Sequence, residues 1–218
     1  PTQDFIGRED NPKKVVTTIE ILIFFTILSL APAIVLMMTS FTRIVIVLSF
    51  VRRALATQEV PPNQVIIGIA LLLTFFTMMP TLSAIKRDAL DPYTSEDANK
   101  AITQAEALKR TEAHMRKFMF EHARLKDIRL FVDASGINKD QLTEDDVPTD
   151  ALIGAFVISE LRRAFIMGFA IFLPFMIIDM VVSAMLISMG MLVLPPVLIS
   201  LPFKLLLFIL VDGWHLII

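Results

Sequence analysis

The chain has 218 residues, of which 55% are hydrophobic, carries a formal net charge of −2 and contains no cysteine. This charge gives no basic face for a nucleic-acid partner, and the missing thiols exclude disulfide, iron–sulfur and thiolate chemistry. The apolar residues come in four long blocks rather than at the dispersed spacing of a soluble domain. Since a membrane helix needs ~20 predominantly apolar residues, the sequence predicts an all-α membrane protein.

The first 18 residues are polar, and we interpret residues 1–18 as an extramembrane leader. The chain begins with Pro1 rather than Met, which removal of a signal peptide or trimming would explain. The first apolar block, 21–51, would form a straight helix of ~46 Å against a hydrocarbon core of ~30 Å, which is too long for one simple span. We therefore expect a kink at Pro32 and a break in the patch 39–43.

A polar turn with two arginines and two prolines, between residues 52 and 62, leads into a shorter apolar block, 65–85. The same order of long block, double proline and short block occurs again near the end of the chain. We therefore expect two kinked helical hairpins, residues 19–87 and 157–218. Between them we expect a small helical extracytoplasmic subdomain, residues 88–156.

The stretch 88–150 holds nine basic and fourteen acidic residues and is the water-compatible part of the chain. Thr94–Asp97 has the pattern of a capping box, which predicts a helix start there. His114 and His122 lie eight positions apart, which is not a metal-ligand spacing. With no phosphate loop, zinc-protease motif or nucleophile elbow in the sequence, we expect no enzyme activity, no metal and no cofactor.

The charges that flank the blocks conflict with a simple topology. Arg52 and Arg53 favour a cytoplasmic turn between the first two blocks. The basic pairs 86–87 and 162–163 would then lie outside, against the positive-inside rule. We infer a chain that partner subunits hold in place, rather than an ordinary four-span protein.

One carboxylate, Asp179, lies in the middle of the third apolar block. A charge in hydrocarbon costs several kcal/mol unless it is paired or hydrated. Ser183 shares its helical face, and Ala184 and Ser188 form a small-xxx-small pair that favours close contact between membrane helices. The charged groups available for inter-helix or inter-subunit ion pairs are Glu160, Asp179 and Asp212 on one side and Arg162, Arg163 and Lys204 on the other.

The end of the third block is rich in methionine and runs into a double proline. Met189 and Met191 flank Gly190, where we expect the helix to open into a gate loop, residues 189–196. Irregular backbone at membrane depth is tolerated only when it is buried in protein or lines a cavity. Because methionine adapts to irregular partners, a ring of these side chains could seal a pore and still deform around a passing polypeptide.

Several stretches resemble the signature of the FliP family, called SctR in injectisomes. They cover both hairpins and are, in chain order, Ser40–Val47, Ala164–Phe169 with Leu173–Phe175 and Asp179, Met189–Pro196, Ile199–Lys204 and Val211–Trp214. Family members end a little beyond the tryptophan, so we expect this chain to lack its last few residues.

The resemblance implies a pore-forming core subunit of the bacterial flagellar type III export gate, which passes unfolded flagellar proteins across the inner membrane. It implies a helical oligomer of several copies with FliQ and FliR, adjacent to FlhA and FlhB in the flagellar basal body and surrounded by membrane lipid. It also implies that Met191, Leu192 and Val193 make the gasket of the gate. An inter-subunit salt bridge would fall on Glu160 and Lys204.

Two alternatives stay open at this point. An injectisome SctR subunit shares the same motifs, and the long insert 88–150 favours the flagellar protein. A small secondary carrier for an ion or solute would explain charges at the membrane midplane and broken helices, with Asp179 as an ion ligand. Many carriers use inverted repeats, whereas hairpins separated by one extramembrane subdomain would run parallel.

Overall fold

The computed structural model describes residues 12–57, 60–95, 97, 101–137, 143–191, 194–213 and 215. The regular elements in these ranges are all helices, so the predicted all-α fold is confirmed. The helices are α1 (Pro12–Met37), α2 (Phe41–Ala54), α3 (Asn63–Ile85), α4 (Asp91–Tyr93), α5 (Gln104–His122), α6 (Leu125–Ala134), α7 (Thr149–Ser188) and α8 (Pro196–Leu210), with a π-helical turn at Lys86–Leu90 and a 3-10 turn at Glu144–Asp146.

The chain divides into two compact units, Pro1–Leu36 and Met37–Ile218. In the first unit, α1 is a single helix that continues through Pro32. The kink expected at this proline stays a prediction. The break expected at residues 39–43 is confirmed, because α1 ends at Met37 and α2 begins at Phe41.

Three helical stretches among the described residues are long and apolar enough to cross a membrane: Thr18–Met37, Asn63–Tyr93 and Thr149–Ser188. The four apolar blocks of the sequence do not become four such helices. The first block is divided between α1 and α2, and the fourth forms α8 with only 15 residues. Helix α8 begins at Pro196, the second residue of the double proline, and ends at Leu210. Two residues later, Asp212 takes a left-handed backbone conformation with a φ of 50°.

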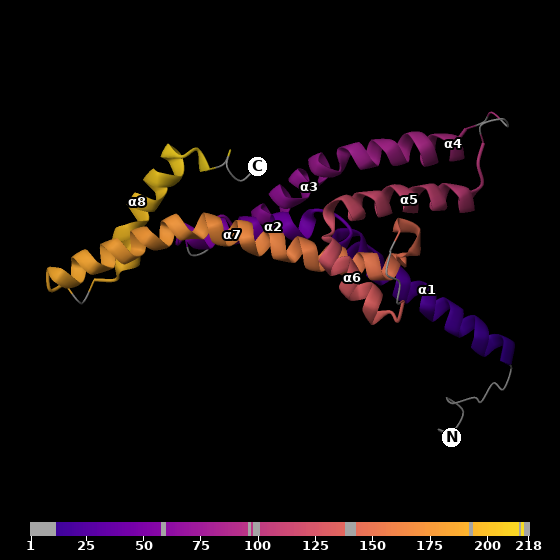
Figure 1. Ribbon diagram of the computed structural model, residues 1–218, viewed down its shortest axis with the longest axis horizontal. Coiled ribbons are helices and arrows are strands. Elements are labelled where there is room, and N and C mark those ends of the chain that lie inside the picture. The colour runs from indigo at the N-terminus through magenta and orange to yellow at the C-terminus, as the bar shows by residue number, and fades with distance from the viewer. Residues whose placement is uncertain are drawn as a thin grey trace, which may run out of the picture. The chain divides into compact units, whose positions relative to one another are not determined.

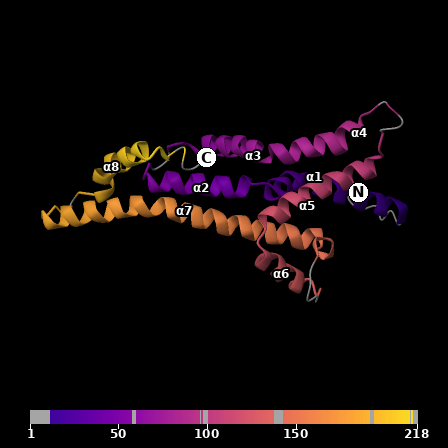
Figure 2. The same cartoon turned by 45° about the horizontal axis from the view of Figure 1, so that its top comes forward.

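In the second unit, α2 lies between α3 and α7, and α8 folds back along the end of α7 (Figures 1 and 2). Phe175 of α7 and Phe208 of α8 pack against the C-terminal part of α2. Helices α2 and α7 approach closely at Gly168, where an added Cβ would lie 2.5 Å from Cδ2 of Phe50. The missing side chain therefore lets the two backbones come together.

The subdomain is formed by α5 and α6 packed on the first part of α7 (Figure 1). Its core contains Phe118 and Met119 of α5, Val132 of α6, and Leu152 and Phe156 of α7. Because α7 runs unbroken for 40 residues, the boundary expected at residue 157 falls inside it. One helix thus carries both the subdomain core and the apolar segment.

The capping box predicted at Thr94 is wrong. Thr94 is the C-cap of α4, and its hydroxyl donates to the carbonyl oxygen of Leu90 at 3.0 Å. Its side chain therefore caps the end of α4 and not the start of a following helix. Helix α5 begins later, with Thr103 as the N-cap that accepts from the backbone N–H of Glu106. A capping box does occur in the subdomain, at Thr143 and Asp146.

Candidate functional site: buried ion pairs and the turn after α7

The first polar cluster within the apolar helices surrounds Glu160 of α7. Its side chain is only 1% exposed and lies between two guanidinium groups. The Oε2 atom is 3.3 Å from Nε of Arg43, and the Oε1 atom is 3.4 Å from Nη1 of Arg163. Because two cations meet one carboxylate, the cluster carries a net positive charge.

Arg43 lies in the first turn of α2 and reaches this cluster through the packing of α2 on α7. Ser40, the N-cap of α2, is fully buried, and its Oγ has no hydrogen-bond partner among the described residues. Arg43 itself is 19% exposed. The guanidinium group therefore lies at the edge of the packed helices rather than inside them.

The second polar cluster joins α7 to α8. Lys204 donates from Nζ to Oδ2 of Asp179 at 2.6 Å, and Ser200 donates from Oγ to Oδ1 at 2.5 Å. Ser200 and Lys204 lie four residues apart, which places them on one face of α8. The Lys204 side chain is 3% exposed and that of Asp179 is 32% exposed. The carboxylate that the sequence marked as needing a partner has one within its own chain.

The structure does not bring Glu160 and Lys204 together, since each has a different partner in this chain. Their pairing between subunits stays a prediction. Arg162 is exposed and makes no ion pair with any residue that the structure describes.

The predicted packing residues lie around the exposed side of α7. Ala184 and Ser188 are exposed and Ser183 is partly buried. The side of α7 that is buried here carries Val182 and Leu186 instead. The small residues are therefore not covered by the described part of their own chain, and their contact with another helix stays a prediction.

Helix α7 ends in a turn centred on Gly190, whose φ is 74°. Gly190 donates from its backbone N–H to the carbonyl oxygen of Ile187, and Met191 donates to that of Leu186, both at 3.0 Å. This pair of bonds is the Schellman arrangement, in which a glycine takes the left-handed conformation that disfavours a side chain. Met189 is 72% exposed and Met191 is 42% exposed. Two other predicted gate residues, Leu192 and Val193, lie outside the described residues.

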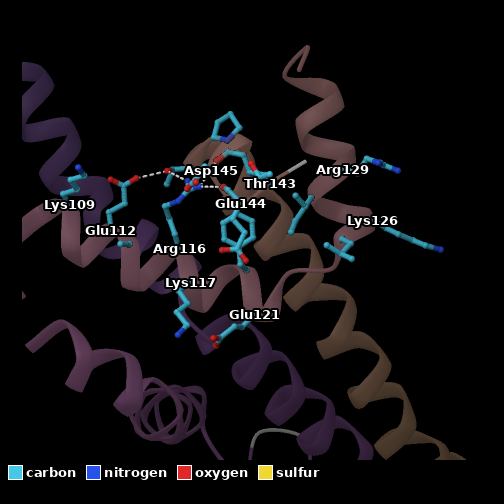
Figure 3. Close-up of a pocket in the computed structure, with 17 residues that line it drawn as sticks. Lys109, Glu112, Arg116, Lys117, Glu121, Lys126, Arg129, Thr143, Glu144 and Asp145 are labelled. Carbon is cyan, nitrogen blue, oxygen red and sulfur yellow. Dashed lines mark hydrogen bonds between the residues drawn. The ribbon is translucent and has the colours of Figure 1, made fainter. Parts of the chain in front are cut away.

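A third feature is a groove of about 1170 Å³ in the subdomain, between α5, α6 and residues 143–149 (Figure 3). Arg116 crosses it and donates to Oγ1 of Thr149 at 2.6 Å and to the carbonyl oxygens of Glu144 and Val147 at 2.9 and 2.8 Å. Thr149 in turn donates to Glu112 at 2.7 Å. Arg116 thus holds this loop on α5.

Sequence reasoning missed Arg43, Ser200 and Arg116. For two of these residues, the sequence contains a feature that could have identified them. Arg43 is the only charge in its apolar block, as Asp179 is in the third, and Ser200 lies one helical turn from Lys204. Arg116 had no such signal, because its acceptors are mostly backbone carbonyls.

Comparison with known proteins gives concordant matches. A family model described as FliP family matches residues 24–218. The flagellar biosynthetic protein FliP of Bacillus subtilis (strain 168) is 53% identical over 213 residues, which cover 98% of this chain and 94% of the relative. The protein of the same name from Aquifex aeolicus (strain VF5) is 47% identical over 204 residues, covering 93% and 84% of the two chains. That of Treponema denticola is 47% identical over 219 residues, covering 99% and 79%.

Proposed function

The chain belongs to the FliP family and is a membrane-embedded component of the flagellar export apparatus, and from this premise we propose that it is a pore-forming core subunit of the type III protein export gate. In this role it passes unfolded flagellar proteins across the bacterial inner membrane. The relatives compared above are flagellar by name, which favours the flagellar export gate over an injectisome and over a small-solute carrier.

The observation that carries the proposal is the turn after α7. A 40-residue helix ends in a glycine-centred turn with a methionine exposed on each side. In an assembly of several copies, these turns would converge on the central path. Flexible thioethers can close against one another when the path is empty and adapt to any polypeptide that passes.

The surface of the second unit supports assembly with other membrane subunits. Large apolar side chains of α7 and α8 are exposed, among them Met180, Met185, Ile187, Leu206 and Ile209. The small residues Ala184 and Ser188 lie on an uncovered side of α7. We propose that further copies, FliQ and FliR cover these surfaces, with FlhA and FlhB adjacent.

The ion pair proposed between subunits, Glu160 with Lys204, has a specific requirement. Lys204 is already bonded to Asp179 at 2.6 Å, so assembly must re-pair it or add Glu160 to the same cluster. Charge reversal at Glu160 should block assembly, and reversal at Lys204 should partly restore it. Failure of that rescue would remove this pair from the proposal.

The gate itself is tested with the double substitution Met189→Ala and Met191→Ala in the full export apparatus. We expect greater ion leakage through the resting gate or less secretion of flagellar proteins. The matched control is Met37→Ala with Met79→Ala, since these methionines are also exposed, 50% and 40%, and lie outside α7 and α8. Unchanged conductance and unchanged secretion in the gate variant would contradict the proposal.

A further inference from the structure

We propose that the groove beside Arg43 is a contact between copies of this chain, in which Arg43 receives the carboxylate of Asp212 from a second copy. This inference rests on the proposed function, because it requires that copies assemble. It assigns to Arg43 a second role besides its ion pair with Glu160.

The first argument is charge. Among the residues that the structure describes, Glu160 is the one carboxylate that pairs with Arg43 and Arg163. Arg43 uses Nε for this contact, and its two terminal nitrogens have no hydrogen-bond or ion-pair partner among the residues that the structure describes. A guanidinium group in a low-dielectric setting favours a second, bidentate acceptor. The cluster is therefore incomplete by one negative charge.

The second argument is the shape and lining of the site. A groove of about 390 Å³ opens between α2, α3 and α7, and Arg43 is the only charged residue among the described residues that line it. The other lining residues are Ile44, Val47, Leu48, Leu73, Phe76, Thr77 and Met167. Such a lining suits an apolar segment that carries a single acid, rather than a soluble anion.

The third argument is depth. Thr77 lies near the middle of the candidate span Asn63–Tyr93, roughly 20 Å along the helix from either end. The phosphate groups of a bilayer lie outside a hydrocarbon core about 30 Å thick. In a bilayer that this candidate span crosses, a lipid headgroup at the surface would therefore not reach the groove, whereas a carboxylate on a protein segment would.

The fourth argument identifies the acid. In the described apolar segments of the second unit, Glu160 and Asp179 already have ion-pair partners. Asp212, which follows α8, is exposed and has no ion pair with any described residue. It lies among the apolar residues of its block, as the groove requires.

The test uses photo-cross-linking in the assembled export apparatus, with copies that carry two different tags. A p-benzoylphenylalanine replaces Phe76, which lines the groove and is 59% exposed. The control replaces Phe75, the adjacent residue of the same type, which is 53% exposed and outside the groove lining. We expect position 76, and not position 75, to link two differently tagged copies at the peptide that contains Asp212.

A double-mutant cycle tests the charge pair separately. Arg43→Gln and Asp212→Asn should each lower the yield of the multimer about tenfold, and the double variant should lose no more than the worse single variant. If the two losses multiply to about a hundredfold in the double variant, the two residues act independently and the proposed pair is wrong. Cross-links from position 76 that reach only lipid, another protein or another segment of the chain would also overturn it. If the unsubstituted chain forms no multimer at all, the proposed function fails rather than this pair alone.

Discussion

The Lys204 side chain is only 3% exposed, and its ion-pair partner among the described residues is the carboxylate of Asp179. Replacement by Lys204→Met should destabilise the fold by about 2 kcal/mol, because it leaves Asp179 partly buried without a cation. The double variant Lys204→Met with Asp179→Leu should recover most of this loss, since it removes both charges. Thermal unfolding in detergent measures the difference. A double variant as unstable as the single one would contradict the account.

At the scale of single residues, the sequence shows which buried charges must be paired more reliably than it shows which residues pair with them. A carboxylate in the middle of an apolar block must be paired or hydrated, and Lys204 was one of three cations available to Asp179. The partner of Glu160 was not foreseen, because Arg43 meets it only through the packing of α2 on α7. Hydrophobic periodicity describes each helix alone and does not say which faces of distant helices meet.

At the scale of elements, the close approach of α2 and α7 depends on Gly168. The substitution Gly168→Ala places a Cβ 2.5 Å from Cδ2 and 2.6 Å from Cγ of Phe50, so the aromatic ring must move. We expect a loss of about 1–3 kcal/mol in unfolding free energy, as for other overpacked positions. Gly68→Ala in α3 is the control, because nothing lies within 4 Å of its added Cβ. Equal stability of the two variants in detergent would argue against this packing.

The loop that Arg116 holds gives a second prediction for elements. Arg116→Lys keeps the charge but loses the planar fork that reaches three acceptors. Amide hydrogen exchange of residues 143–149 should therefore become faster, while the rest of α5 stays protected. Lys117→Gln, on the same helix and the same groove (Figure 3), should leave the exchange unchanged. Equal exchange in both variants would show that Arg116 does not anchor the loop.

The sequence predicted breaks between helices correctly where neighbouring residues alone cause the break. The polar patch 39–43 and the turn with two prolines before α3 both separate helices as expected. The helix start at Thr94 was wrong because the π-helical turn and α4 extend the preceding helix to Tyr93. Contacts distant in sequence hold that extension, since Arg110 of α5 donates to the carbonyl oxygen of Asp88 at 3.1 Å. Such contacts leave no local pattern.

At the scale of the whole molecule, α7 connects the subdomain to the turn at Gly190. Its 40 residues span about 60 Å in a straight helix. One part packs in the subdomain core through Phe156, and the other ends at the Gly190 turn. One helix without a break therefore joins the subdomain core to the Gly190 turn.

Large apolar side chains of α7 and α8 are exposed. The central claim is therefore that this chain assembles with further copies and with other membrane subunits. The most direct measurement is the native mass in mild detergent of this chain alone and co-expressed with FliQ and FliR from the same cell. We predict a discrete multimer of several copies that grows by defined masses when the partners are present. A stable monomer or simple dimer that ignores FliQ and FliR would contradict the export-gate account.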